Sequence, residues 1–135
     1  MSSKKDTVRA IENIVKDYYR SLGYKILKTN YKCKKGKIDI IAKDMVTNEL
    51  VFTEIKSSYY CNKKNYNCEY RFNIENNQNN QKSQKNKQKT IVSATKYYTY
   101  KYNLLNSFIR FDLVEINMRD RIYLKHFKNC EFERL

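Results

Sequence analysis

The sequence predicts an α/β fold in which a mixed central sheet of about five strands is flanked by helices. Two segments, at about residues 7–22 and 85–102, repeat apolar residues every three or four positions, as amphipathic helices do. Five shorter segments are apolar or alternate with period two, as strands do. With 135 residues, 41% of them hydrophobic, the chain (residues 1–135) is expected to form a single domain with a modest core.

The first helix is expected to begin at Asp6 or Thr7, either of which can cap it, and to end before Gly23. Glu12 lies at the edge of its apolar stripe, and a carboxylate beside a buried stripe is unusual. Glu12 is therefore a candidate functional residue. The stripe itself consists of Val8, Ile11, Val15, Tyr19 and Leu22.

Three strands are expected next, at about residues 24–30, 38–43 and 50–57. The turn between the first two is basic and contains Gly36, and the third strand is apolar enough to be central. From about residue 57 to 86, Asn, Gln, Lys and Tyr dominate, and this composition predicts a long Asn/Lys/Tyr-rich loop within the single domain.

Helical spacing returns between Lys85 and Tyr102, where Tyr98 and Tyr102 are expected to face the core. Two further strands are predicted at about residues 108–116 and 122–127. Arg110 and Asp112 share a face of the first of them, so they are expected to pair with each other and not to catalyse.

The candidate chemistry lies on the second and third strands, which carry Asp39 and then Glu54 and Lys56. Because side chains alternate along a strand, Glu54 and Lys56 point the same way, and hairpin pairing can bring Asp39 across from them. Two carboxylates can share Mg²⁺ or Mn²⁺, and Lys56 can orient a water or offset negative charge. The alternative is a surface hairpin with solvated charges, although the strongly apolar flanks argue against it.

The chain carries a formal net charge of +14, which suits a polyanionic partner. Between Ser57 and Asn103 nine basic residues face two acids, and eight of the thirteen tyrosines lie in the same window. Lysines can bind phosphates and tyrosines can stack on unpaired bases. An AT-rich coding bias or a low-complexity insertion would also produce this composition. The candidate phosphate contacts are Lys82, Lys85, Lys87 and Lys89.

No apolar run approaches the roughly 20 residues needed to span a bilayer. The start of the chain leads into an amphipathic pattern instead of a secretory signal, so a cytoplasmic location without membrane association is expected. The four cysteines lack C-x-x-C spacing and a paired histidine, so reduced thiols are favoured over a zinc site.

Several segments, in this order, resemble the YraN-like family, a branch of the restriction-endonuclease-like nucleases with the PD-(D/E)XK motif. Residues 36–42 are similar to the family's G-E-I-D-L-I-A segment, and residues 50–56 are similar to its L-V-F-V-E-V-K segment. Residues 110–114 resemble R-F-D-V-V, and His126 with Asn129 and Phe132 resembles its closing H-I-x-N-A-F. The likeness extends over most of the chain, from about Val8 to Phe132.

This resemblance implies a restriction-endonuclease-like core in which Asp39, Glu54 and Glu12 bind Mg²⁺ or Mn²⁺ and Lys56 assists hydrolysis. Two departures stand out: Lys37 replaces the usual Glu, and Ser58 replaces the Arg that often follows E-x-K. The four chemical positions are intact.

The leading hypothesis is a metal-dependent endonuclease that hydrolyses phosphodiester bonds in nucleic acid, DNA before RNA, and recognises strand structure more than sequence. Cutting both strands favours two copies of the site, so a homodimer is an open expectation. The alternatives are a non-catalytic nucleic-acid-binding protein that retains the nuclease fold, and an accessory protein whose tyrosine-rich loop docks another protein. The lone His126 is expected to be structural.

Overall fold

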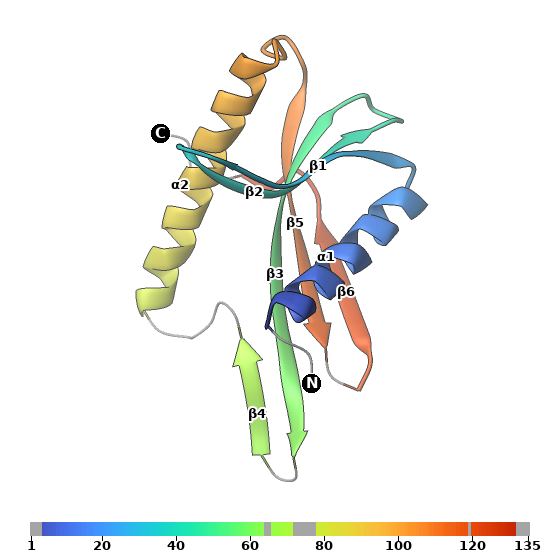
Figure 1. Ribbon diagram of the computed structural model, residues 1–135, viewed down its shortest axis with the longest axis vertical. Helices are drawn as coiled ribbons and strands as arrows, with labels where there is room; N and C mark the ends of the chain where they lie inside the picture. The colour runs from blue at the N-terminus through green and yellow to red at the C-terminus, as the bar shows by residue number, and fades with distance from the viewer. Residues whose placement is uncertain (1–3, 64–65, 72–77, 119, 132–135) are drawn as a thin grey trace.

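The computed structural model describes residues 4–63, 66–71, 78–118 and 120–131, with the backbone alone for residues 4 and 59–88. In these residues two helices and a six-stranded sheet are present (Figure 1). The predicted α/β class, with a mixed sheet and flanking helices, is confirmed. The elements are α1 (Lys4–Ser21), β1 (Tyr24–Cys33), β2 (Gly36–Asp44), β3 (Leu50–Lys63), β4 (Tyr66–Arg71), α2 (Gln78–Lys101), β5 (Ile109–Met118) and β6 (Ile122–Phe127).

The sheet has the order β1-β2-β3-β5-β6, and β4 pairs with β3 beside this path. The pair β3–β5 is parallel and the other pairs are antiparallel. A parallel neighbour requires a crossover connection, and α2 provides the helical part of it. β3 is therefore the central strand, as its apolar start predicts.

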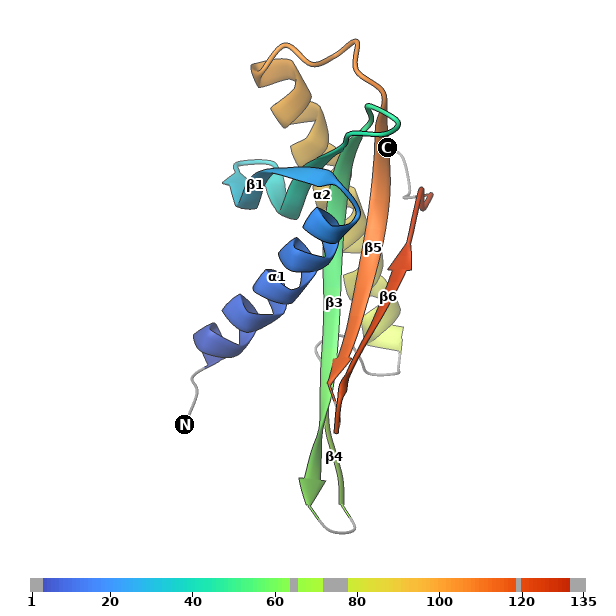
Figure 2. The same cartoon turned by 90° about the vertical axis from the view of Figure 1, so that its right-hand side faces the viewer.

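The predicted long loop over about residues 57–86 is wrong for most of its length. β3 continues to Lys63, β4 forms a hairpin with it, and α2 begins at Gln78. The sequence lacks apolar periodicity here, but tyrosine favours strands, and lysine and glutamine favour helices. These residue preferences are compatible with the elements that the burial pattern does not mark. The hairpin of β3 and β4 projects away from both helices (Figures 1 and 2).

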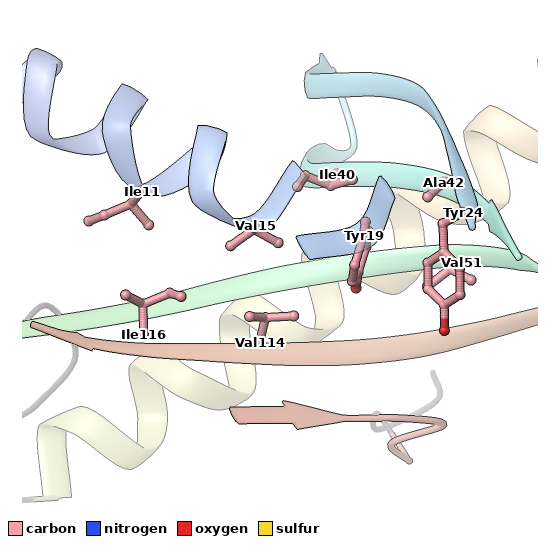
Figure 3. Packing of buried hydrophobic residues seen from close by; sticks show 9 residues of the cluster. All are labelled: Ile11, Val15, Tyr19, Tyr24, Ile40, Ala42, Val51, Val114 and Ile116. Atoms are coloured by element: carbon pink, nitrogen blue, oxygen red, sulfur yellow. The ribbon is translucent and has the colours of Figure 1, made fainter. Parts of the chain in front are cut away.

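α1 covers one face of the sheet with the centre of its predicted stripe. Ile11 and Val15 lie over Ile116 and Val114 of β5 (Figure 3), and all four side chains are buried. The two ends of the predicted stripe, Val8 and Leu22, are exposed, so the stripe is shorter than the sequence indicates.

α2 covers the opposite face, where a second core cluster is formed by Ile38, Ile41, Leu50, Phe52, Ile91, Val92, Ala94 and Tyr98. Tyr98 is buried as predicted. The prediction for Tyr102 is wrong, because 43% of this residue is exposed. The helix ends at Lys101, so Tyr102 lies beyond the part of α2 that packs on the sheet.

Gly36, the first residue of β2, fixes how closely the β1–β2 turn approaches α2. Its φ is +154°, and a Cβ placed there would overlap the backbone carbonyl of Thr90. Only glycine fits this contact without a backbone shift.

Cys33 and Cys130 are free thiols. None of the described helices combines the length and the hydrophobicity that crossing a membrane requires.

Candidate active site

Asp39, Glu54 and Lys56 are the three residues predicted to carry the chemistry. They lie where the strand paired with one edge of β3 changes from β2 to β4. The described pairing of β3 with β2 ends at Thr53, opposite Ile40. Its pairing with β4 begins at Ser58. Between these positions the other edge of β3 remains paired with β5. Glu54 and Lys56 lie in this interval, so the site occupies the fork between β2 and β4.

Asp39 is fixed at this fork by the backbone of β3. It stands one residue beyond the last β2–β3 pair, which places it across from Glu54. Its Oδ2 atom accepts a hydrogen bond of 2.8 Å from the backbone amide of Ile55. Because the strand ladder has already ended, the carboxylate supplies the acceptor that this amide needs. Asp39 therefore has a defined orientation, with 24% of its side chain exposed.

Glu54 and Lys56 point to the face of the sheet that α2 covers. Phe52 belongs to the core cluster on that face, and the alternation along β3 assigns Glu54 and Lys56 to the same side. Glu54 is only 2% exposed, whereas Lys56 is partly exposed. The site thus combines a deep carboxylate with a cation that solvent can reach.

Cys130 also belongs to this neighbourhood, although nothing in the sequence marks it. Its backbone amide binds the carbonyl of Phe111 at 2.7 Å. Burial raises the pKa of its thiol, and the charges of Lys56 and Glu54 act on it in opposite directions. Cys130 comes close to Glu54 and Lys56 because the end of the chain folds back. No local sequence pattern marks such a contact, so the sequence does not identify this thiol as a site residue.

Glu12 is not brought into a metal-binding group with Asp39 and Glu54. It lies on α1, which packs on the face opposite to that of Glu54. Within the ranges that the structure describes, no group of three or more His, Cys, Asp or Glu side chains could hold a metal ion. The role of Glu12 stays a prediction that rests on the family resemblance alone.

Two carboxylates nevertheless suit the predicted cation. Mg²⁺ usually keeps several waters and takes one or two protein carboxylates, together with substrate phosphates. Asp39 and Glu54 provide that number of hard oxygen donors on neighbouring strands. Of the predicted phosphate contacts, Lys89 is partly buried on α2. The side chains of Lys82, Lys85 and Lys87 lie outside the described residues.

A second polar cluster, on the α1 face, is organised by Arg110. Its guanidinium binds Asp112 at 3.0 Å, as the sequence predicts, and also Asp44 at 2.9 Å and Glu49 at 2.8 Å. Burial alone raises the pKa of Asp44, but the bonds from Arg110 and from the Val46 and Thr47 amides prevail and lower it to about 2. The β2–β3 turn is thereby tied to β5.

His126 connects the same cluster to α1. Its Nε2 atom lies 2.7 Å from the Asp112 carboxylate, and its Nδ1 atom lies 3.0 Å from the hydroxyl of Tyr18. One residue along α1, the hydroxyl of Tyr19 bonds Thr53 at 2.6 Å, and burial raises the Tyr19 pKa. The bond of Tyr19 holds α1 against β3, the strand that carries Glu54. The bonds of His126 join α1, β5 and β6, as expected of a structural residue.

Comparison with known proteins assigns the chain to a family. Residues 11–116 match the model of the uncharacterised protein family UPF0102. A UPF0102 protein of Clostridioides difficile (strain 630) is 35% identical over 119 residues, which are 88% of this chain and 90% of that protein. One from Clostridium perfringens (strain 13 / Type A) is 34% identical over 107 residues, 78% of this chain and 75% of the relative. The chain therefore belongs to the uncharacterised protein family UPF0102.

Proposed function

We propose that this protein is a metal-dependent endonuclease with a restriction-endonuclease-like core that hydrolyses phosphodiester bonds, with DNA as the preferred substrate. The observation that carries the proposal is the meeting of Asp39 with Glu54 and Lys56 at the fork of β2 and β4. The resemblance of these segments to PD-(D/E)XK nucleases supports the same assignment.

Each residue of the fork has a role that follows from its position. Asp39 and Glu54 would hold Mg²⁺ or Mn²⁺, which when bound polarises the scissile phosphate and acidifies a water. The Ile55 amide keeps the Asp39 carboxylate in place through a hydrogen bond to its Oδ2 atom. Lys56 is partly exposed, so its ammonium group can position the attacking water and offset negative charge at the phosphate.

The sequence of α2 supports a polyanionic substrate. The helix carries six lysines and no acid, and the whole chain has a net charge of +14. Phosphate contacts position a nucleic acid without reading its bases. A single domain of this size therefore favours recognition of strand structure over recognition of sequence, and two copies would be needed to cut both strands of a duplex together.

The test is cleavage of labelled single strand, duplex, flap and four-way junction, in DNA and in RNA, with Mg²⁺, with Mn²⁺ or with a chelator. Asp39→Asn keeps an acceptor for the Ile55 amide but removes the charge, and Lys56→Ala removes the ammonium group. Asp17→Asn and Lys125→Ala make the same charge changes at exposed positions on α1 and β6. Metal-dependent cleavage that both site variants lose, and both controls keep, is the expected result.

A second candidate is a nucleic-acid-binding protein that retains the fold without turnover. It is favoured by the finding that the described residues bring no third metal-binding side chain to Asp39 and Glu54. Binding that weakens steeply with salt, without cleavage in either metal, would support this alternative and contradict the nuclease.

A further inference from the structure

The end of α2 carries an exposed aromatic hollow. It is lined by Tyr97, Tyr100, Lys101, Asn103 and Leu105, which are called the α2-end patch from here on. Tyr100 is 73% exposed, although tyrosine has a large apolar ring. Exposed aromatic rings around a hollow offer apolar faces on which a partner can stack. The support and the charge of the patch indicate which kind of partner it can bind.

The patch is mounted on a rigid base. Tyr98, next to Tyr97, is buried and its ring centre lies 5.9 Å from that of Phe52 in the core. It also lies 5.2 Å from the ring centre of Tyr31 and 4.8 Å from that of Tyr102. Leu104 closes the helix end with a hydrogen bond of 2.7 Å to the Thr99 carbonyl. A surface that is already ordered loses little conformational entropy on binding.

The charge around the patch selects an anionic partner. The ammonium group of Lys101 lies 6.0 Å from the ring centre of Tyr97 and 5.5 Å from that of Tyr102. No Asp or Glu occurs in the sequence between Glu75 and Asp112. A partner therefore meets flat aromatic faces and positive charge together, which is the combination that binds single-stranded nucleic acid.

We propose that the α2-end patch binds unpaired bases of single-stranded nucleic acid, stacked on Tyr97 and Tyr100, with Lys101 contacting the backbone. The inference deepens the proposed function and rests on it for the identity of the substrate class. Bases inside a duplex are already stacked on their neighbours, so their faces are not available to the tyrosines. A single strand, or the unpaired part of a branched substrate, is therefore the preferred ligand.

The chain that leaves the patch leads to β3, the strand that carries Glu54 and Lys56. The chain after Leu105 leads to Phe108, whose carbonyl binds the amide of Leu50, the first residue of β3, at 2.8 Å. Glu54 follows four residues along the same strand, about 13 Å from Leu50. The patch is therefore linked to the fork through the first residue of β3.

The experiment is fluorescence anisotropy with a labelled DNA single strand and a duplex of equal length, in chelator so that no cleavage occurs. The double variant Tyr97→Leu/Tyr100→Leu removes both rings, whereas Tyr97→Phe/Tyr100→Phe keeps the stacking faces. Tyr123→Leu on β6 removes a ring that is also exposed but lies on a different element.

We expect the leucine pair to weaken single-strand binding by about 5- to 150-fold for each ring that stacks on a base. Duplex binding should change by less than about twofold, and the phenylalanine pair and Tyr123→Leu should bind as the wild type does. Unchanged single-strand binding in the leucine pair would overturn the proposal. An equal loss for duplex, or an equal loss in the phenylalanine pair, would overturn it as well.

These binding outcomes do not depend on whether the protein is a nuclease. If the wild-type protein cuts no substrate but the leucine pair selectively loses single-strand binding, the patch stands and the nuclease fails. If metal-dependent cleavage is found while the leucine pair binds single strands normally, the nuclease stands and the patch fails.

Discussion

The ammonium group of Lys37 lies 3.6 Å from the Asp39 carboxylate, on the Oδ1 atom that the Ile55 amide does not use. A cation at this place competes with a metal for the same oxygen. The resemblance to YraN-like proteins makes the contact notable, because Lys37 stands where that family usually has Glu. Under the proposed function, the residue two positions before Asp39 is therefore expected to influence how readily the fork takes a divalent ion.

Removing this competitor should strengthen metal binding. Two charges at this separation interact by about 1 kcal/mol in water, so we expect Lys37→Ala to lower the Mn²⁺ dissociation constant by about fivefold. Lys37→Glu should lower it further because it adds a carboxylate. Isothermal titration with Mn²⁺ measures the effect, with Lys35→Ala in the exposed turn as control. Equal dissociation constants in Lys37→Ala and Lys35→Ala would contradict the prediction.

Loss of Arg110 should destabilise the fold strongly. Arg110→Met leaves the buried carboxylates of Asp44 and Asp112 without their shared cation, and breaking a buried pair in this way costs about 3–5 kcal/mol. The free energy of unfolding in urea is the measurement. Arg20→Met, which breaks an exposed pair with Asp17, should cost less than about 1 kcal/mol. Similar losses in the two variants would show that the Arg110 cluster adds little.

The same cluster should make stability depend on acid pH. Because the pKa of Asp44 is lowered to about 2 in the folded protein, and is about 3.9 in an unfolded chain, its ionised form favours folding. The contribution is complete above about pH 5, and it is lost as the pH falls from about 4 toward 2, a change of about 2 kcal/mol.

Comparison with Asp44→Asn isolates this contribution. The difference in unfolding free energy between wild type and Asp44→Asn should be constant from pH 7 to pH 5 and shrink between pH 4 and pH 2. Asp112, whose pKa is also lowered, titrates in both proteins, and the part of its contribution that does not depend on Asp44 cancels in the difference. A difference that stays the same down to pH 2 would show that Asp44 titrates alike in the folded and unfolded states.

The two glycines of the chain should tolerate alanine to different degrees. Gly23 has a φ of +84° and open space where a Cβ would lie, so Gly23→Ala should cost only the backbone strain of about 1–2 kcal/mol. Gly36→Ala should cost about 1–3 kcal/mol more, because the new methyl group overlaps the Thr90 carbonyl and α2 must move. Thermal or urea unfolding of both variants measures this, and equal costs would contradict the close approach of α2.

Most of the elements could be predicted because their signals are local. The alternation around Asp39 and the spacing of Glu54 and Lys56 place all three on adjacent strands of a hairpin, and the structure confirms that placement. The β3–β4 hairpin and the first half of α2 could not be predicted from burial, because no apolar pattern marks them. The strand and helix preferences of single residues are the signal that remains in this polar segment, and a reading based on burial overlooks it.

The contacts between residues that are far apart in the sequence could not be predicted, for a different reason. Arg110 is 66 residues from Asp44, and the two meet only because β5 crosses over to lie beside β3. Cys130 reaches the neighbourhood of Glu54 because the chain after β6 folds back to Phe111 of β5. The sequence does predict the contact of Arg110 with Asp112, since these residues are two apart on one strand face.

The parallel pairing of β3 with β5 has a consequence for the order of folding. The β2–β3 hairpin closes over a short turn, whereas Leu50 can pair with Ile109 only after α2 has been made and has crossed the sheet. Pairing across such a long loop is entropically costly and therefore slow. In a chain synthesised from its N-terminus, the segments that carry Asp39 and Glu54 can therefore pair with each other before the segment that carries Arg110 is present. Until β5 pairs with it, the second edge of β3 has unpaired backbone groups and is open to pairing with other strands.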